Sequence, residues 1–179
     1  MTGIPAIVDF WAQAGRDENW FSKNPAFDPE FRARFLAAHE NAAAGGNEEW
    51  LASPDGALAL LILTDQFPRN AFRGTARMYA TDTLARRYAR TAIDAGYFLL
   101  VPPELRLFFA LPFAHSEDAG DQDISVALNA ALGAPYLTHA KRHRDIVRRF
   151  GRFPHRNEIF GRVSTEEEID FLAKGGFAG

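Results

Sequence analysis

Hydrophobic residues recur at helical spacing along almost the whole chain. Near the start, Ile7 and Trp11 share one stripe, and further on Ile124, Leu128 and Leu132 fall at every fourth position. This spacing is typical of amphipathic helices, and no alternating strand pattern of useful length interrupts it. The sequence therefore predicts an all-α fold of about eight helices, packed as antiparallel helical hairpins with short loops.

One stretch is apolar on every side, from Ala57 to Leu63, and such a helix belongs at the centre of a protein. It leads into the hexapeptide Asp-Gln-Phe-Pro-Arg-Asn at residues 65–70, and the related Phe-Pro-His-Arg-Asn follows at 153–157. Because proline interrupts helices, we expect helices to end at Phe67-Pro68, Leu111-Pro112 and Phe153-Pro154. In both motifs the phenylalanine would be buried and would hold the following arginine in place.

Composition narrows the class of protein. The 179 residues are 47% hydrophobic, which is enough for one domain over 1–179 with an ample core. A net charge of −3 favours neither nucleic acid nor membrane as a partner, and the absence of cysteine excludes disulfides and thiolate chemistry. Asp9 near the start and the shortness of every apolar run argue against a signal peptide and a membrane span, so we expect a cytoplasmic protein.

Five segments stand in a fixed order along the chain, at residues 65–70, 72–74, 115–118, 142–145 and 151–157. Together they resemble one bacterial family, the domain-of-unknown-function family 924 (DUF924), which is placed in the tetratricopeptide-like superfamily. The resemblance extends from residues 8–11 to Ser164-x-x-Glu167, a capping-box pattern that predicts the start of the last helix. It implies an all-helical, antiparallel hairpin fold and no particular activity.

The two proline motifs and the residues around them supply candidate ligand-binding side chains. Guanidinium groups bind carboxylates and phosphates in a forked geometry, so a small anionic metabolite clamped by Arg69 and Arg156 is the leading hypothesis. The alternative is that these arginines pair with nearby carboxylates or with helix-end carbonyls, and that the asparagines only stabilise turns. The candidates are Arg69, Asn70, Arg73, Arg152, Arg156 and Asn157.

Candidate catalytic residues centre on the segment His115-Ser116-Glu117-Asp118, which follows a proline. A histidine beside carboxylates can act as a general acid or base near neutral pH. His115 or His155 would then transfer protons, with Asp65 or Glu117 orienting them, in a hydrolase or lyase reaction without a cofactor. The alternative makes Ser116 a helix N-cap followed by two first-turn acids, and whether the protein is an enzyme at all stays open.

His139 and His143 are four residues apart on one predicted helix, a spacing that allows two imidazoles to share a metal. No third ligand follows at a telling spacing, and His143 falls on the apolar stripe, where we expect it to hydrogen-bond within the core. The sequence therefore predicts no metal and no cofactor.

Two other kinds of partner are alternatives to the anion. Helical-hairpin proteins often bind peptides in a groove, which makes a protein–protein interaction scaffold the first alternative. The second is RNA binding by the basic stretch 141–162, although its aromatic residues Phe150, Phe153 and Phe160 are expected to be buried rather than available for base stacking. The oligomeric state cannot be predicted from the sequence.

Overall fold

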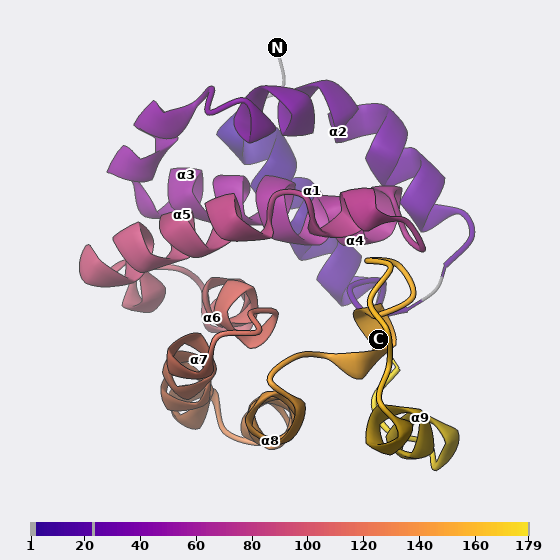
Figure 1. The fold of residues 1–179 in the computed structure, drawn as a ribbon. Helices are drawn as coiled ribbons and strands as arrows, with labels where there is room; N and C mark the ends of the chain where they lie inside the picture. The colour runs from indigo at the N-terminus through magenta and orange to yellow at the C-terminus, as the bar shows by residue number, and fades with distance from the viewer. Residues whose placement is uncertain (1–2, 23, 179) are drawn as a thin grey trace. The chain divides into compact units, whose positions relative to one another are not determined.

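The computed structural model describes residues 3–22 and 24–178, and within these ranges it contains helices and turns but no strand. The all-α prediction is confirmed (Figure 1). Over the described residues the α-helices are α1 (Ile4–Arg16), α2 (Phe27–Ala43), α3 (Pro54–Leu61), α4 (Phe67–Ala71), α5 (Asp82–Asp94), α6 (Leu107–Ala114), α7 (Ala119–Leu132), α8 (Tyr136–Phe150) and α9 (Glu166–Ala173).

The chain divides into two compact units. The first comprises the described residues up to Arg73 together with Arg77–Pro112, and the second comprises Gly74–Ala76 and the chain from Phe113 onward. That the two fold as a single domain, as the sequence indicates, stays a prediction.

In the first unit, α3 is the innermost helix. Every residue from Ala57 to Leu63 is 0% exposed, which confirms the expected central helix. Ser53 caps its N-terminus by accepting a hydrogen bond from the Gly56 N–H, and α1 and α5 pack against it. Aromatic side chains of α1 and α2 complete this core, so the first unit is held together mainly by buried apolar surface.

The helix does not end at Phe67-Pro68, contrary to the expectation from the sequence. The chain stays helical from α3 through a π-helical turn, Ile62–Gln66, into α4, with Pro68 inside the run. Pro68 has no N–H to offer the carbonyl of Thr64 four residues earlier. The Thr81 hydroxyl donates to that carbonyl instead, at 2.6 Å, so the missing donor is replaced from outside the helix.

The two neighbouring carbonyls of the π turn are also bonded by side chains. Nδ1 of the buried His39 lies 2.8 Å from the Leu63 oxygen, and the Arg69 guanidinium donates to the Asp65 oxygen at 2.8 Å. Burial lowers the pKa of His39, so its ring is neutral and donates through Nδ1. Side-chain donors therefore satisfy three consecutive carbonyls where the helix widens.

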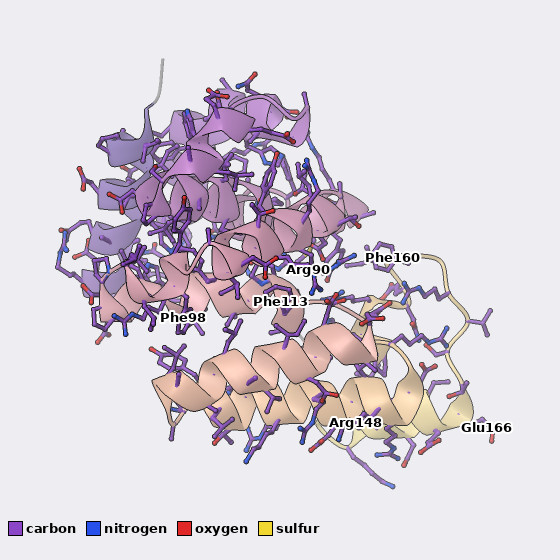
Figure 2. All side chains as sticks on the ribbon, turned by 90° about the vertical axis from the view of Figure 1, so that its left-hand side faces the viewer. Arg90, Phe98, Phe113, Arg148, Phe160 and Glu166 are labelled. Atoms are coloured by element: carbon purple, nitrogen blue, oxygen red, sulfur yellow. The ribbon has the colours of Figure 1, made fainter. Side chains whose placement is uncertain are left out.

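In the second unit, α7 and α8 run side by side as a helical hairpin (Figure 2). Ile146 and Val147 of α8 pack with the buried Phe153, and Phe150 and Phe171 cover this small core. The sequence predicts that Pro112 breaks or kinks its helix; α6 continues through Pro112, so no helix ends at Leu111-Pro112. Gly151, in the left-handed conformation, ends α8 two residues before the second proline motif.

Helix starts in the second unit differ from the sequence prediction by one or two residues. Asp118, not Ser116, caps α7 by accepting from the Asp121 N–H at 2.9 Å. The capping box of α9 uses Thr165 and Glu168 rather than the preceding Ser-x-x-Glu pattern. Both patterns match in the sequence, and the ion pair between Arg152 and Glu168 favours the second.

Candidate functional site

The first proline motif carries a buried ion triad. Arg69 forks onto Asp82, with N–O distances of 2.9 and 3.1 Å, and also lies 3.1 Å from Asp65. Burial lowers the pKa of Arg69, but the two carboxylates outweigh it and raise the pKa above its usual value. Arg69, which the sequence predicts to bind a small anion, therefore already has two carboxylates of its own unit as partners.

Asn70 and Arg73 follow the triad in the same unit. Arg73 donates to Asp28 at 3.1 Å and to the Asn70 Oδ1 at 3.0 Å. These two candidate ligand-binding residues therefore connect the end of α4 to the first turn of α2.

One candidate in the second unit joins two of its loops. Glu117 accepts from the Phe153 N–H and from Arg162, both at 2.9 Å. Burial raises the pKa of Glu117, but these two donors outweigh it, so the pKa lies below its usual value and the carboxylate is ionised. Glu117 therefore ties the segment after α6 to the start of the second motif.

Arg152 and Asn157 meet at the buried carboxylate of Glu168 in α9. Arg152 donates twice, at 2.6 and 2.8 Å, and Asn157 donates at 3.2 Å. The bonds from Arg152 lower the pKa of Glu168 to about 2. These two candidates therefore hold α9, whose first residue, Glu166, is labelled in Figure 2.

The remaining candidates of the second unit, His115, His155 and Arg156, belong to a cluster that also contains His143. The ring of His143 lies 5.5 Å from the Phe153 ring, and that of His155 lies 5.6 Å from it, while the Arg156 guanidinium sits 4.5 Å above the same ring. We call His115, His143, His155 and Arg156 the imidazole cluster.

Two ring nitrogens of the imidazole cluster lack the partners that buried polar atoms usually have. Nδ1 of His143 and Nδ1 of His155 are both buried and bond to nothing in the described part of the chain. Burial, with His115 and Arg156 nearby, lowers the pKa of His143 to about 3, and burial with Arg156 lowers that of His155 to about 4. Both imidazoles are therefore neutral at pH 7.

His143 is the residue that sequence reasoning misjudged. It was expected to hydrogen-bond within the core, whereas its ring packs against Phe153 and Phe177 and its Nδ1 has no partner among the described residues. Its place on the apolar stripe of α8 was the available signal, since a polar side chain there needs either a partner or a function. His139, one turn earlier, is exposed.

Within residues 3–22 and 24–178 no group of three or more histidines and carboxylates is arranged to hold a metal ion. No helix in these ranges is long and apolar enough to span a membrane.

The sequence model of a family of bacterial proteins of unknown function, DUF924, matches residues 7–176 of this chain. The chain belongs to the DUF924 family. The chain is similar to a solved structure, that of a protein of unknown function from Agrobacterium tumefaciens: the two are 53% identical, the match covers 96% of this chain and 97% of that one, and the TM-score is 0.94. Among curated proteins, none matches the chain.

The DUF924 match establishes the family without assigning a role to any residue. Asp65, Arg69, Asn70 and Arg73 lie in the first unit, and the other candidates lie in the second. The expectation that Arg69 and Arg156 approach one cavity stays a prediction.

Proposed function

We propose that the second unit binds a small anion, a phosphate or a carboxylate, at the imidazole cluster. The observation that carries this proposal is the pair of buried, unbonded ring nitrogens of His143 and His155 beside the Arg156 guanidinium. A buried polar atom without a partner costs roughly 1–3 kcal/mol, so two in one place favour a ligand that satisfies them.

The electrostatics support an anion rather than a cation. Besides burial, Arg156 lowers the pKa of both His143 and His155, and Glu117, the carboxylate that raises the pKa of His155, is paired with Arg162. An entering anion would reverse the effect of Arg156 and favour the protonated rings. Binding and proton uptake should therefore be linked, with affinity rising as the pH falls.

A neutral imidazole is also the form that a general base requires. If the protein is an enzyme, His155 or His115 would accept a proton from the bound substrate, with Glu117 fixing the loop between them. Hydrolysis and elimination are the simplest reactions of this kind, and neither needs a cofactor. We place this activity in the cytoplasm.

Titration of the whole protein with inorganic phosphate tests the proposal. Calorimetry at pH 7.5 and pH 5.5 should show binding at both values, tighter at the lower one. His155→Gln should weaken binding about tenfold. His139→Gln is the matched control, because this imidazole is exposed, and it should bind as the wild type does. Undetectable binding of phosphate and of acetate at both pH values would refute the proposal.

A peptide-binding scaffold is the second candidate, and the α7–α8 hairpin favours it. Such hairpins are the unit of tetratricopeptide-like proteins, the superfamily that the sequence resembles. RNA is the weaker alternative, because Arg148, Arg149 and Arg152 already pair with Asp123, Glu167 and Glu168. Phe160 is 39% exposed, so the expectation that it is buried is wrong, but one ring makes no stacking platform.

A further inference from the structure

A second candidate site lies in the first unit, where α2 packs against α4. An open hollow of about 420 Å³ is formed there by one face of α2 and the end of α4. The residues around it are Asp28, Pro29, Arg32, Ala33, Leu36, Asn70 and Ala71.

The hollow has an aliphatic floor and a polar rim. Pro29, Ala33 and Leu36 follow one another at helical spacing on α2, and Ala71 faces them from α4. Asp28 and Arg32, also four residues apart, place opposite charges at neighbouring points of the same rim.

Asn70 supplies a donor of fixed direction. Only 8% of the residue's surface is exposed, and its Oδ1 accepts a hydrogen bond from Arg73. The amide is thereby oriented, because the oxygen must face Arg73 and the nitrogen must face away. That nitrogen donates to nothing in the described part of the chain.

The charged residues of the rim also keep unused capacity. The Asp28 side chain is 22% exposed at the rim, where its Oδ2 accepts from Arg73 at 3.1 and 3.2 Å. Arg32 lies over the Phe72 ring at 5.6 Å and has no hydrogen bond to any described residue. The rim therefore offers two donors, one of them cationic, and one acceptor.

We propose that this hollow binds an acylated apolar amino acid through its carboxylate, its amide N–H and its side chain. The carboxylate bonds Arg32 and the Asn70 amide nitrogen, the amide N–H donates to Asp28, and the apolar side chain lies on Ala33, Leu36 and Ala71. The same three groups occur in a free N-acyl amino acid and at the C-terminus of a peptide. The proposal is independent of the anion site, which lies in the other unit.

The probe is N-acetyl-L-leucine, titrated into the whole protein and followed by backbone amide shifts in NMR. Shifts should concentrate at residues 28–36 and 70–71. N-acetyl-L-leucine amide has the same shape without the charge, and it should bind at least about tenfold more weakly, because a hydrogen bond to a charged group is lost. Equal binding of the acid and the amide would overturn the proposal.

Two variants separate binding from folding. Ala33→Trp fills the hollow from an exposed helix position and should abolish the shifts at 70–71 while the melting temperature is kept. Arg32→Gln should weaken the acid about tenfold and leave the amide unaffected. Arg86→Gln, an equal loss of charge on α5, is the control. Unchanged affinity in both Ala33→Trp and Arg32→Gln would overturn the site.

A short peptide ending in leucine distinguishes the two sources of the ligand. Affinity at least about tenfold above that of N-acetyl-L-leucine assigns the site to chain ends, whereas equal affinity assigns it to the free acylated amino acid. If neither probe binds at millimolar concentration, the proposal is rejected.

Discussion

The two proline motifs share their sequence but not their structure. In the first unit, Phe67-Pro68 lies inside a continuous helical run, and Arg69 is neutralised by two carboxylates. In the second unit, Phe153-Pro154 follows the end of α8, and it places His155 and Arg156 beside other imidazoles. Both phenylalanines are buried, as expected. The shared motif therefore predicts the burial of its phenylalanine, whereas the partners of its arginine depend on the surrounding chain.

The largest effect should come from charging the centre of the first unit. Leu61→Asp puts a carboxylate without a partner where the side chain is 0% exposed, which should cost several kcal/mol and prevent folding. Leu99→Asp, at an exposed position, is the control. Circular dichroism and thermal melting measure both. Loss of all helical signal would support a single folding domain, whereas a residual cooperative transition would show that the second unit folds alone.

The next effect compares the two arginine–carboxylate sites directly. Arg69→Met leaves Asp65 and Asp82 buried without a cation and should reduce the free energy of unfolding by about 3 kcal/mol or more. Arg162→Met leaves the more exposed Glu117 with the Phe153 N–H and should cost about 1 kcal/mol or less. Urea titration gives both values. Equal costs would contradict the contrast between a buried triad and a half-exposed clamp.

The imidazoles of the second unit predict a pH dependence with a definite sign. The folded pKa values of His143 and His155, about 3 and about 4, lie below the value of about 6.5 expected when unfolded. The unfolded chain therefore binds more protons as the pH falls below 6.5, and stability is lost between pH 6.5 and about pH 4 for His155 and about pH 3 for His143. The slope is at most about 1.4 kcal/mol per pH unit for each ring.

Replacing His143 and His155 measures how much each imidazole contributes to the pH dependence of stability. His143→Asn and His155→Gln should each flatten the dependence of the urea midpoint on pH between 6.5 and 4, whereas His139→Gln should not. His39, buried in the first unit with a lowered pKa, contributes in the same direction and remains in all three variants. An unchanged slope in both cluster variants would show that the rings are solvated.

A smaller effect should follow from Thr81→Val, which removes the hydroxyl that bonds the Thr64 carbonyl. The loss should be about 1 kcal/mol in the free energy of unfolding, because one buried acceptor loses its donor. Thr83→Val, at the exposed second residue of α5, should be neutral within about 0.5 kcal/mol. Equal stability of the two variants would mean that the π turn does not need Thr81.

Removal of metal ions is expected to have no effect on the protein. Purified protein should contain no stoichiometric transition metal, and EDTA should leave its melting temperature unchanged. Elemental analysis and a melt with the chelator check this. One zinc per chain would mean that the imidazole cluster of the second unit is a metal site, and the contrast between the units would then have to be redrawn.

The sequence predicts the helices well because their apolar stripes and glycine ends are local signals. It could not predict that the helix continues through Pro68, because the replacement donor, Thr81, lies 17 residues away. The capping box of α9 was ambiguous for the same reason, since Arg152 selects Glu168 across 16 residues. Side-chain pairs between residues this far apart cannot be recognised from the spacing of hydrophobic residues.

The candidate site was only partly predictable. His115, His155 and Arg156 stand out as charged or titratable residues beside turns, and one unit holds all three. His143 was set aside because burial usually implies a satisfied partner, and only coordinates reveal an unbonded nitrogen. Of the two carboxylates that pair with Arg69, only Asp65 could be predicted, because it is close in sequence and Asp82 is not.

The continuous helical run from Pro54 to Ala71 also limits where this chain can tolerate insertions and deletions. Each residue of an α-helix advances the direction of the next side chain by about 100°. Removing one residue from α3 would therefore rotate Pro68 and everything after it by that angle relative to the start of α3. Arg69 would leave Asp82, and no local shift of the loop could restore it, because Phe67 is fixed among Phe31 and His39. Changes in chain length should accumulate before Pro54 or after Arg73, and the helical run between them should keep its length.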